Sequence, residues 1–95
     1  MRGEPEQAVR WIIAGRVQGV GFRWFAVQRA QKLHISGWVT NLPDGRVEVV
    51  GRGTGSQLQA LEQELRKGPS GANVETVEKS DIPHQAVPPK TFGIK

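Results

Sequence analysis

Three short stretches alternate apolar side chains with polar or small ones, a period of two that is typical of β-strands. They are residues 9–14, 36–42 and 46–51. The first carries apolar side chains on both faces, with Val9, Trp11 and Ile13 on one and Ile12 on the other, so we expect a central strand. The other two flank Pro43-Asp44-Gly45, a strong turn signal, and form a predicted hairpin.

One helix is predicted over residues 22–33, where apolar residues recur at the spacing of an amphipathic helix. We expect Phe22 and Phe25 to pack in the core. Trp24 and Val27 fall off the main apolar stripe, so we expect them to be half-buried or to lie near the rim of a site.

A second helix is predicted over residues 56–67. Its apolar stripe consists of three leucines, Leu58, Leu61 and Leu65. Ser56 followed three residues later by Gln59 is a capping-box pattern, and Gly68-Pro69 predicts the end of the helix.

The remaining segments are less regular. Residues 73–79 predict a weaker strand, in which two valines are out of period and indicate a bulge or an early end. Residues 81–90 contain three prolines and predict an irregular excursion, and residues 91–95 predict a short last strand. Residues 1–8 are polar and are expected to form a loose tail.

The predicted order is therefore β-α-β-β-α-β with a short C-terminal strand, the split β-α-β pattern. We expect an α+β protein with a ferredoxin-like two-layer α/β sandwich, in which a largely antiparallel sheet carries both helices on one face. A chain of 95 residues supports one modest core, so a single domain spanning residues 1–95 is predicted. Many functions share this fold, so the function has to be argued from the site.

Composition excludes several classes of site. The chain has no cysteine, which excludes disulfides and a thiol nucleophile, and its two histidines belong to no cluster with metal-ligand spacing. The net charge of +4 attracts anions, but Lys and Arg are spread along the chain, so we expect no nucleic-acid partner. No apolar run reaches the length of a membrane span or a signal peptide, so we expect a cytoplasmic protein without a membrane partner.

A glycine-rich connection joins the first predicted strand to the first helix: Gly15-Arg16-Val17-Gln18-Gly19-Val20-Gly21-Phe22-Arg23. The free N–H groups and the dipole of a helix start favour an anion, and glycines let backbone amides converge on it. Arg23 adds a planar, permanently charged group suited to phosphate oxygens. The residues alone leave two interpretations open, a pocket for a small phosphate-bearing ligand and an ordinary tight turn with a surface arginine.

Asn41 interrupts the apolar pattern of its predicted strand face, which it shares with Gly37 and Val39. Either it ends the strand and supports the turn that follows, or its amide holds a water or a substrate oxygen beside the glycine-rich connection. The spacing leaves both explanations open.

The neighbourhood of the connection supplies no Ser/His/Asp or Cys/His constellation, no carboxylate pair and no P-loop lysine. An enzyme built there would act by positioning and electrostatics, the usual mode of phosphoryl transfer. Such a site suits a leaving group that needs no general acid, and a carboxylate qualifies because the pKa of its conjugate acid is about 4. Acyl phosphates are therefore the best-matched class of phosphates.

Two long, ordered motifs carry a resemblance to a known family. The connection from Gly15 to Arg23 resembles the first signature of the acylphosphatase family, and Gly37-Trp38-Val39-Thr40-Asn41-Leu42-Pro43-Asp44-Gly45-Arg46-Val47, with Gly53 beyond it, resembles the second. The similarity covers nearly the whole chain. It implies hydrolysis of the carboxyl–phosphate bond on a ferredoxin-like fold, without a metal, another cofactor or a phosphoenzyme.

The resemblance also implies roles for residues. Arg23 is the implied phosphate-binding arginine, and Asn41 is the residue that orients the attacking water. The implied phosphate cradle consists of the backbone amides of Gln18, Gly19, Val20, Gly21, Phe22 and Arg23. We expect the substrate phosphate itself to accept the proton of the water, and inorganic phosphate to be both product and competitive inhibitor. The chain departs from the usual family pattern at Thr40 and Trp24, which concern the pocket rim.

Three other interpretations remain open. The domain could be a non-catalytic phosphate- or anion-binding module on the same fold, although Arg23 and Asn41 weigh against it. It could belong to a larger carbamoyl-transferring maturation protein, although the length of the chain argues against this interpretation. It could bind nucleic acid, although no single strand presents the paired aromatics that stack bases. The sequence does not specify which acyl phosphate is the substrate, and we expect a monomer.

Overall fold

The computed structural model describes residues 4–95, which form a five-stranded sheet and two α-helices. The elements are β1 (Glu6–Arg16), α1 (Phe22–Lys32), β2 (Ser36–Asn41), β3 (Val47–Thr54), α2 (Gly55–Lys67), β4 (Asn73–Ile82), the short 3₁₀ helix η1 (His84–Ala86) and β5 (Phe92–Ile94). The strand order is β4-β1-β3-β2-β5, and only the pairing of β2 with β5 is parallel among the described strands. This topology confirms the predicted ferredoxin-like sandwich with a short last strand.

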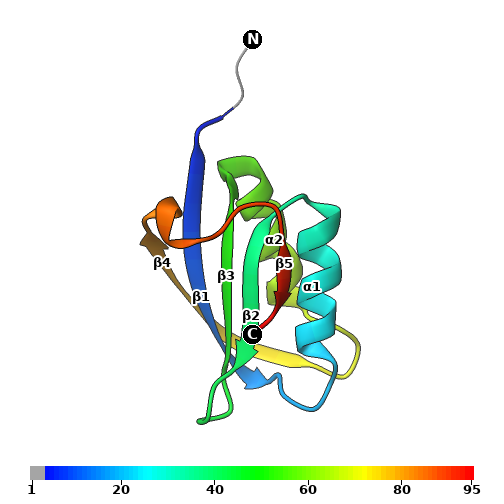
Figure 1. Cartoon of the computed structure of the whole chain (residues 1–95). Helices are drawn as coiled ribbons and strands as arrows, with labels where there is room; N and C mark the ends of the chain where they lie inside the picture. Colours follow the sequence, from blue (N-terminus) through cyan, green and yellow to red (C-terminus); the bar gives the residue numbers. More distant parts are fainter. Residues whose placement is uncertain (1–3) are drawn as a thin grey trace.

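The main core lies between the sheet and the two helices, which cover the same face of the sheet (Figure 1). The strands contribute Val9, Trp11, Ile13, Val39, Val47 and Val49, and the helices contribute Phe22, Ala26, Val27, Ala30, Leu58, Leu61 and Leu65. Alternate residues of a strand face one side, so the predicted inner face of the first strand is confirmed. β1 lies between β4 and β3, as expected for a central strand.

The opposite face of the sheet is covered by the connection from β4 to β5, which crosses β1 and β3 (Figure 1). Val87 is fully buried there against Ala8 and Val50. The Val87 carbonyl also accepts a hydrogen bond of 2.8 Å from Arg52 Nη1. The proline-rich segment is therefore largely irregular, as predicted, but it is anchored to the sheet and contains η1.

β1 and β3 are longer than predicted because they pair with each other along their length. Glu6 of β1 pairs with Thr54 of β3, and β3 continues through Gly53, beyond the predicted end at residue 51. The prediction that residues 1–8 form a loose tail is therefore wrong for the part that pairs in the sheet. Residues 1–3 lie outside the described chain.

β4 confirms the predicted bulge but not the predicted early end. Its register with β1 shifts between Ala14 and Gly15, opposite Glu75. Beyond the bulge the strand continues to Ile82, which pairs with Ala8. The irregular segment therefore begins only after Ile82, because pairing with the central strand extends a sequence that is weak by itself.

The start of α2 and one side chain of α1 differ from expectation. The N-cap of α2 is Thr54, whose hydroxyl accepts a hydrogen bond from the Gln57 N–H while the Gln57 side chain accepts one from the Thr54 N–H. A capping box is therefore present, but the predicted pair of Ser56 and Gln59 is wrong. Val27 is buried in the core rather than half-buried. Within residues 4–95, neither helix is long and apolar enough to cross a membrane.

Candidate active site

The glycine-rich connection turns from β1 into α1 through glycines in the left-handed region. Gly19 and Gly21 have φ values of +75° and +76°, which other residues rarely adopt. Apart from the glycine itself and its chain neighbours, no described residue has an atom within 4 Å of a Cβ placed on either glycine. Backbone conformation therefore requires these glycines, and the space beside them is open to a ligand.

The N-terminus of α1 has no side-chain cap within the described chain. Gly21 is its N-cap, and the first turn contains no acidic residue, whereas α2 begins with a capping box. The first N–H groups of an α-helix have no partner inside the helix, and the helix dipole makes this end attractive to anions. The start of α1 can therefore bind an anion with unused backbone donors.

Arg23 is the second residue of α1, and its side chain is exposed. Five other arginines form ion pairs with carboxylates: Arg10, Arg29, Arg46, Arg52 and Arg66. Arg23 forms no such pair with any residue in the range 4–95. Its guanidinium is therefore available for an anion held at the start of the helix.

Asn41 is the last residue of β2 and shares a strand face with the buried Val39, toward the helices. In the described part of the chain, its Oδ1 is the one buried side-chain polar atom without a hydrogen-bond partner. Leaving a buried acceptor without a donor costs about 1–3 kcal/mol. An unpartnered acceptor favours the explanation that Asn41 holds a small donor molecule over the explanation that it only ends a strand.

The Gln18 side chain ties the glycine-rich connection to the hairpin that follows Asn41. Its Nε2 donates hydrogen bonds of 2.9 Å to the Leu42 carbonyl and 3.0 Å to the Arg46 carbonyl. The Leu42 N–H donates to the same Arg46 carbonyl, so the Gln18 side chain binds at the base of the hairpin. Only the backbone amide of Gln18 was expected to contribute, but its side chain also fixes the two motifs relative to each other.

A cleft of about 170 Å³ brings the two motifs together. Its walls include most of the predicted site residues: Gln18, Gly19, Gly21, Phe22, Arg23 and Asn41. Val20 is not among the lining residues, and its side chain packs against the core. Trp24 lies at the cleft, where a rim position was expected. Val17 and Ile94 also line it, and sequence reasoning missed both.

Arg23 is the one charged side chain among the described residues that line the cleft, so the cleft carries a positive charge. Asp44 lies in the hairpin turn outside the cleft lining, where hydrogen bonds from the backbone N–H and the side chain of Arg46 lower its pKa against an opposing effect of desolvation. Among residues 4–95, no group of three or more His, Cys, Asp or Glu side chains could hold a metal ion. The donors that the cleft offers therefore suit an anion.

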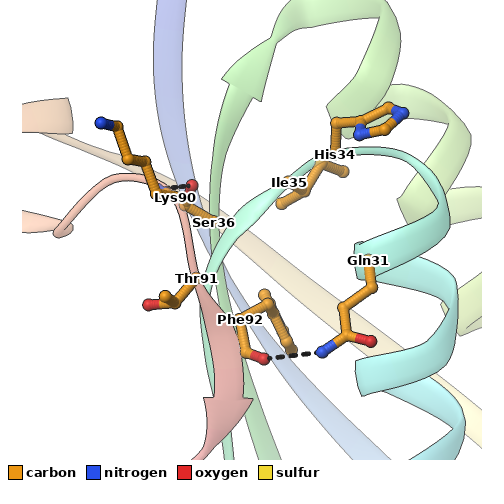
Figure 2. Close-up of a pocket in the computed structure, with 7 residues that line it drawn as sticks. All are labelled: Gln31, His34, Ile35, Ser36, Lys90, Thr91 and Phe92. Carbon is orange, nitrogen blue, oxygen red and sulfur yellow. Dashed lines mark hydrogen bonds between the residues drawn. The ribbon is translucent and has the colours of Figure 1, made fainter.

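A larger hollow of about 590 Å³ lies at the other end of α1 and contains none of the predicted site residues. Figure 2 shows its lining residues and two internal hydrogen bonds. The Lys90 N–H donates to Ser36 Oγ at 2.7 Å, and Gln31 Nε2 donates to the Phe92 carbonyl at 3.3 Å. Neither the uncapped start of α1 nor the unpartnered Asn41 amide lines this hollow, so we place the candidate site in the smaller cleft.

Comparisons with known proteins point to one family. The family model for acylphosphatase matches residues 9–94. An acylphosphatase from Koribacter versatilis is 47% identical over 78 residues, which cover 82% of this chain and 71% of that protein. The solved structure of an acylphosphatase from Coxiella burnetii superposes with a TM-score of 0.86 at 33% identity and covers 95% of this chain and 93% of that one.

A larger protein contains a similar fold. The crystal structure of full-length HypF in the phosphate- and nucleotide-bound form superposes with a TM-score of 0.85 at 27% identity. The similarity covers 99% of this chain but only 12% of HypF. The family model and the Koribacter relative both cover most of this chain. The chain therefore belongs to the acylphosphatase family of enzymes.

Proposed function

We propose that the cleft between α1 and β2 hydrolyses acyl phosphates. Arg23 and the glycine-rich connection between β1 and α1 hold the phosphate, and Asn41 positions the water. The observation that carries this proposal is the buried, unpartnered Oδ1 of Asn41 in the same cleft as the uncapped start of α1. Within residues 4–95, Asn41 Oδ1 is an acceptor without a donor, and the first N–H groups of α1 are donors without a side-chain acceptor. A water and a phosphate satisfy the two together.

The phosphate binds to the backbone N–H groups of the connection and of the first turn of α1. Gly19 and Gly21 support this assignment because their conformation leaves the space beside them open. The Arg23 guanidinium donates to the phosphate oxygens from the side of the helix. Charge-assisted hydrogen bonds of this kind contribute about 1.5–3 kcal/mol each.

Asn41 Oδ1 accepts a hydrogen bond from a water and directs the water oxygen toward phosphorus. A bond forms between this oxygen and phosphorus as the bond from phosphorus to the carboxyl oxygen breaks. The carboxylate leaves with the electron pair of that bond, and the proton of the water passes to a phosphate oxygen. The products are a carboxylate and inorganic phosphate. The leaving group needs no protonation because the pKa of its conjugate acid is about 4.

The test is phosphate release from benzoyl phosphate by the purified protein in excess EDTA. We expect rapid turnover, because the proposed donors are all protein groups. Loss of activity that a divalent ion restores would contradict the metal-free mechanism. A folded protein that binds inorganic phosphate but turns over no acyl phosphate would instead establish the binding module, the alternative function on this fold.

A matched pair of variants tests the role of Arg23 in the same assay. Arg23→Ala should lower kcat/KM by at least about a hundredfold, as does the loss of other preorganised donors. Arg16→Ala is the control, because Arg16 is also an exposed arginine of the first motif but does not line the cleft. Equal activities of the two variants would remove Arg23 from the mechanism.

Two further statements complete the proposal. Inorganic phosphate inhibits competitively, because it occupies the same donors as the substrate phosphate. The chain acts as a monomer. Initial rates at increasing phosphate concentrations and sedimentation velocity test the two statements.

A further inference from the structure

Two large apolar side chains are exposed at the same place. Among residues 4–95, Trp24 and Ile94 are the large hydrophobic residues that remain substantially exposed, at 61% and 49%. Single exposed apolar residues are common on protein surfaces and need no explanation. These two come from distant parts of the chain, and both line the candidate cleft beside Arg23 and Asn41.

The backbone positions both side chains at the mouth of the cleft. Trp24 follows Arg23 in the first turn of α1. Ile94 pairs with Val39 in the parallel ladder between β5 and β2, so it lies on the strand face that Val39 shares with Asn41. The Lys95 N–H donates to the Val39 carbonyl at 2.9 Å, which fixes the end of β5 beside β2.

The size of the cleft leaves part of any substrate at this mouth. Its volume is about 170 Å³, whereas pockets that enclose a whole small molecule measure about 300–1,000 Å³. Arg23 and the start of α1 provide the anion donors, so the phosphate occupies the interior. The acyl group then extends outward between Trp24 and Ile94.

We propose that Trp24 and Ile94 form an acyl-binding rim that favours acyl phosphates with an aromatic or branched apolar acyl group over those with a small or charged one. This inference rests on the proposed function, because it assigns the phosphate to the interior. An apolar group gains by leaving water against these side chains, and an aromatic group also gains from the indole ring. A charged acyl group would lose hydration there, because Arg23, the charged side chain among the lining residues, is occupied by the phosphate.

The test compares kcat/KM for benzoyl phosphate and acetyl phosphate in the wild type, Trp24→Ala, Ile94→Ala and Trp24→Phe. Each variant is compared with the wild type on the same substrate, so differences in intrinsic reactivity cancel. We expect Trp24→Ala and Ile94→Ala to lower kcat/KM for benzoyl phosphate by about tenfold. This value is at the lower end of the discrimination that one apolar contact gives between substrates. Activity on acetyl phosphate should change by less than about twofold, and Trp24→Phe should resemble the wild type.

The inference is overturned if Trp24→Ala and Ile94→Ala lower kcat/KM equally for the two substrates, or lower it for neither. Both residues are largely exposed, and circular dichroism with thermal unfolding will verify that each variant is folded. If the wild type hydrolyses neither substrate, the proposed function fails, and calorimetry then decides the inference separately. Benzylphosphonate, which cannot be hydrolysed, should bind the wild type about tenfold more tightly than Trp24→Ala, whereas methylphosphonate should not distinguish them. Equal affinities of the wild type and Trp24→Ala for benzylphosphonate would contradict the proposed acyl-binding rim.

Discussion

Glycines of the two motifs fall into two physical classes at the scale of single residues. A Cβ on Gly15 would lie 2.1 Å from the Asn73 carbonyl oxygen, and one on Gly37 would lie 1.9 Å from that of Val50. Close backbone packing therefore requires these two. Gly19 also has a positive φ, but a Cβ there would meet no described atom within 4 Å. The motif spacing alone does not distinguish a glycine that packs from one that opens a site.

This difference predicts two unfolding results. Gly15→Ala should lower the free energy of unfolding by at least about 3 kcal/mol, because backbone atoms of β1 and β4 must move apart. Gly19→Ala should lower it by only about 1–2 kcal/mol, the strain of a left-handed alanine. Urea unfolding of both variants provides the measurement, and equal losses would contradict the assignment.

At the scale of elements, the site depends on how the glycine-rich connection is held against the hairpin. Nε2 of Gln18 donates to the Leu42 and Arg46 carbonyls, and Leu42 follows Asn41 directly. The anion donors and the Asn41 amide therefore keep a fixed separation. A displacement of about 1 Å at such a site can lower activity by about a hundredfold.

Gln18→Glu keeps the shape of this side chain but replaces the donor with an oxygen that faces two carbonyl oxygens. We expect kcat for benzoyl phosphate to fall by about tenfold or more through misplacement of Asn41. Gln28→Glu is the control, because it makes the same change on an exposed position of α1. A Gln18→Glu enzyme with wild-type kinetics would show that these hydrogen bonds do not position the site.

The order of the elements, the sheet faces and most of the cleft were predictable, because they follow from local periodicity and from two long motifs. The start of α2 was not, because Thr54 with Gln57 and Ser56 with Gln59 fit the capping-box pattern equally well. Pairing of β3 with β1 through Thr54 decides between them. Ile94 was missed at the cleft for a similar reason, since only the long-range pairing of β5 with β2 brings it there.

At the scale of the whole molecule, a hydrogen bond joins the helix layer to the sheet. The fully buried Trp11 of β1 donates its indole N–H to Glu62 of α2 at 2.9 Å. Partial burial raises the pKa of Glu62, but hydrogen bonds from Trp11 and Arg66, together with the charge of Lys79, outweigh it and leave the pKa below its ordinary value. The ionised carboxylate is therefore the form that stabilises the fold.

The sign of this shift predicts how stability depends on pH. Because the folded pKa lies below the unfolded one, the contribution of Glu62 is complete above the ordinary value of 4.5 and is lost as pH falls through the folded pKa. Glu62→Gln retains an acceptor for Trp11 but cannot titrate. It should be less stable than the wild type near neutral pH, and the difference should shrink in acid.

The measurement is urea unfolding of the wild type and of Glu62→Gln between about pH 7 and about pH 3. Glu75→Gln removes an exposed carboxylate with the same change in charge and serves as the control. A stability difference for Glu62→Gln that stays constant over this range would show that the shift does not contribute to stability.

We propose that Asn41 Oδ1, which no described protein group partners, holds the attacking water. The most direct measurement compares wild type with Asn41→Ala for turnover of benzoyl phosphate, for inhibition by inorganic phosphate and for the free energy of unfolding. We predict that kcat falls by at least about a hundredfold and that phosphate inhibition changes by less than about threefold, since Arg23 and the backbone donors remain. Stability should change little, because no described protein group hydrogen-bonds to Asn41 Oδ1 and its proposed partner is a water. Near-wild-type kcat/KM, or a destabilised protein whose activity loss follows from unfolding, would contradict the account.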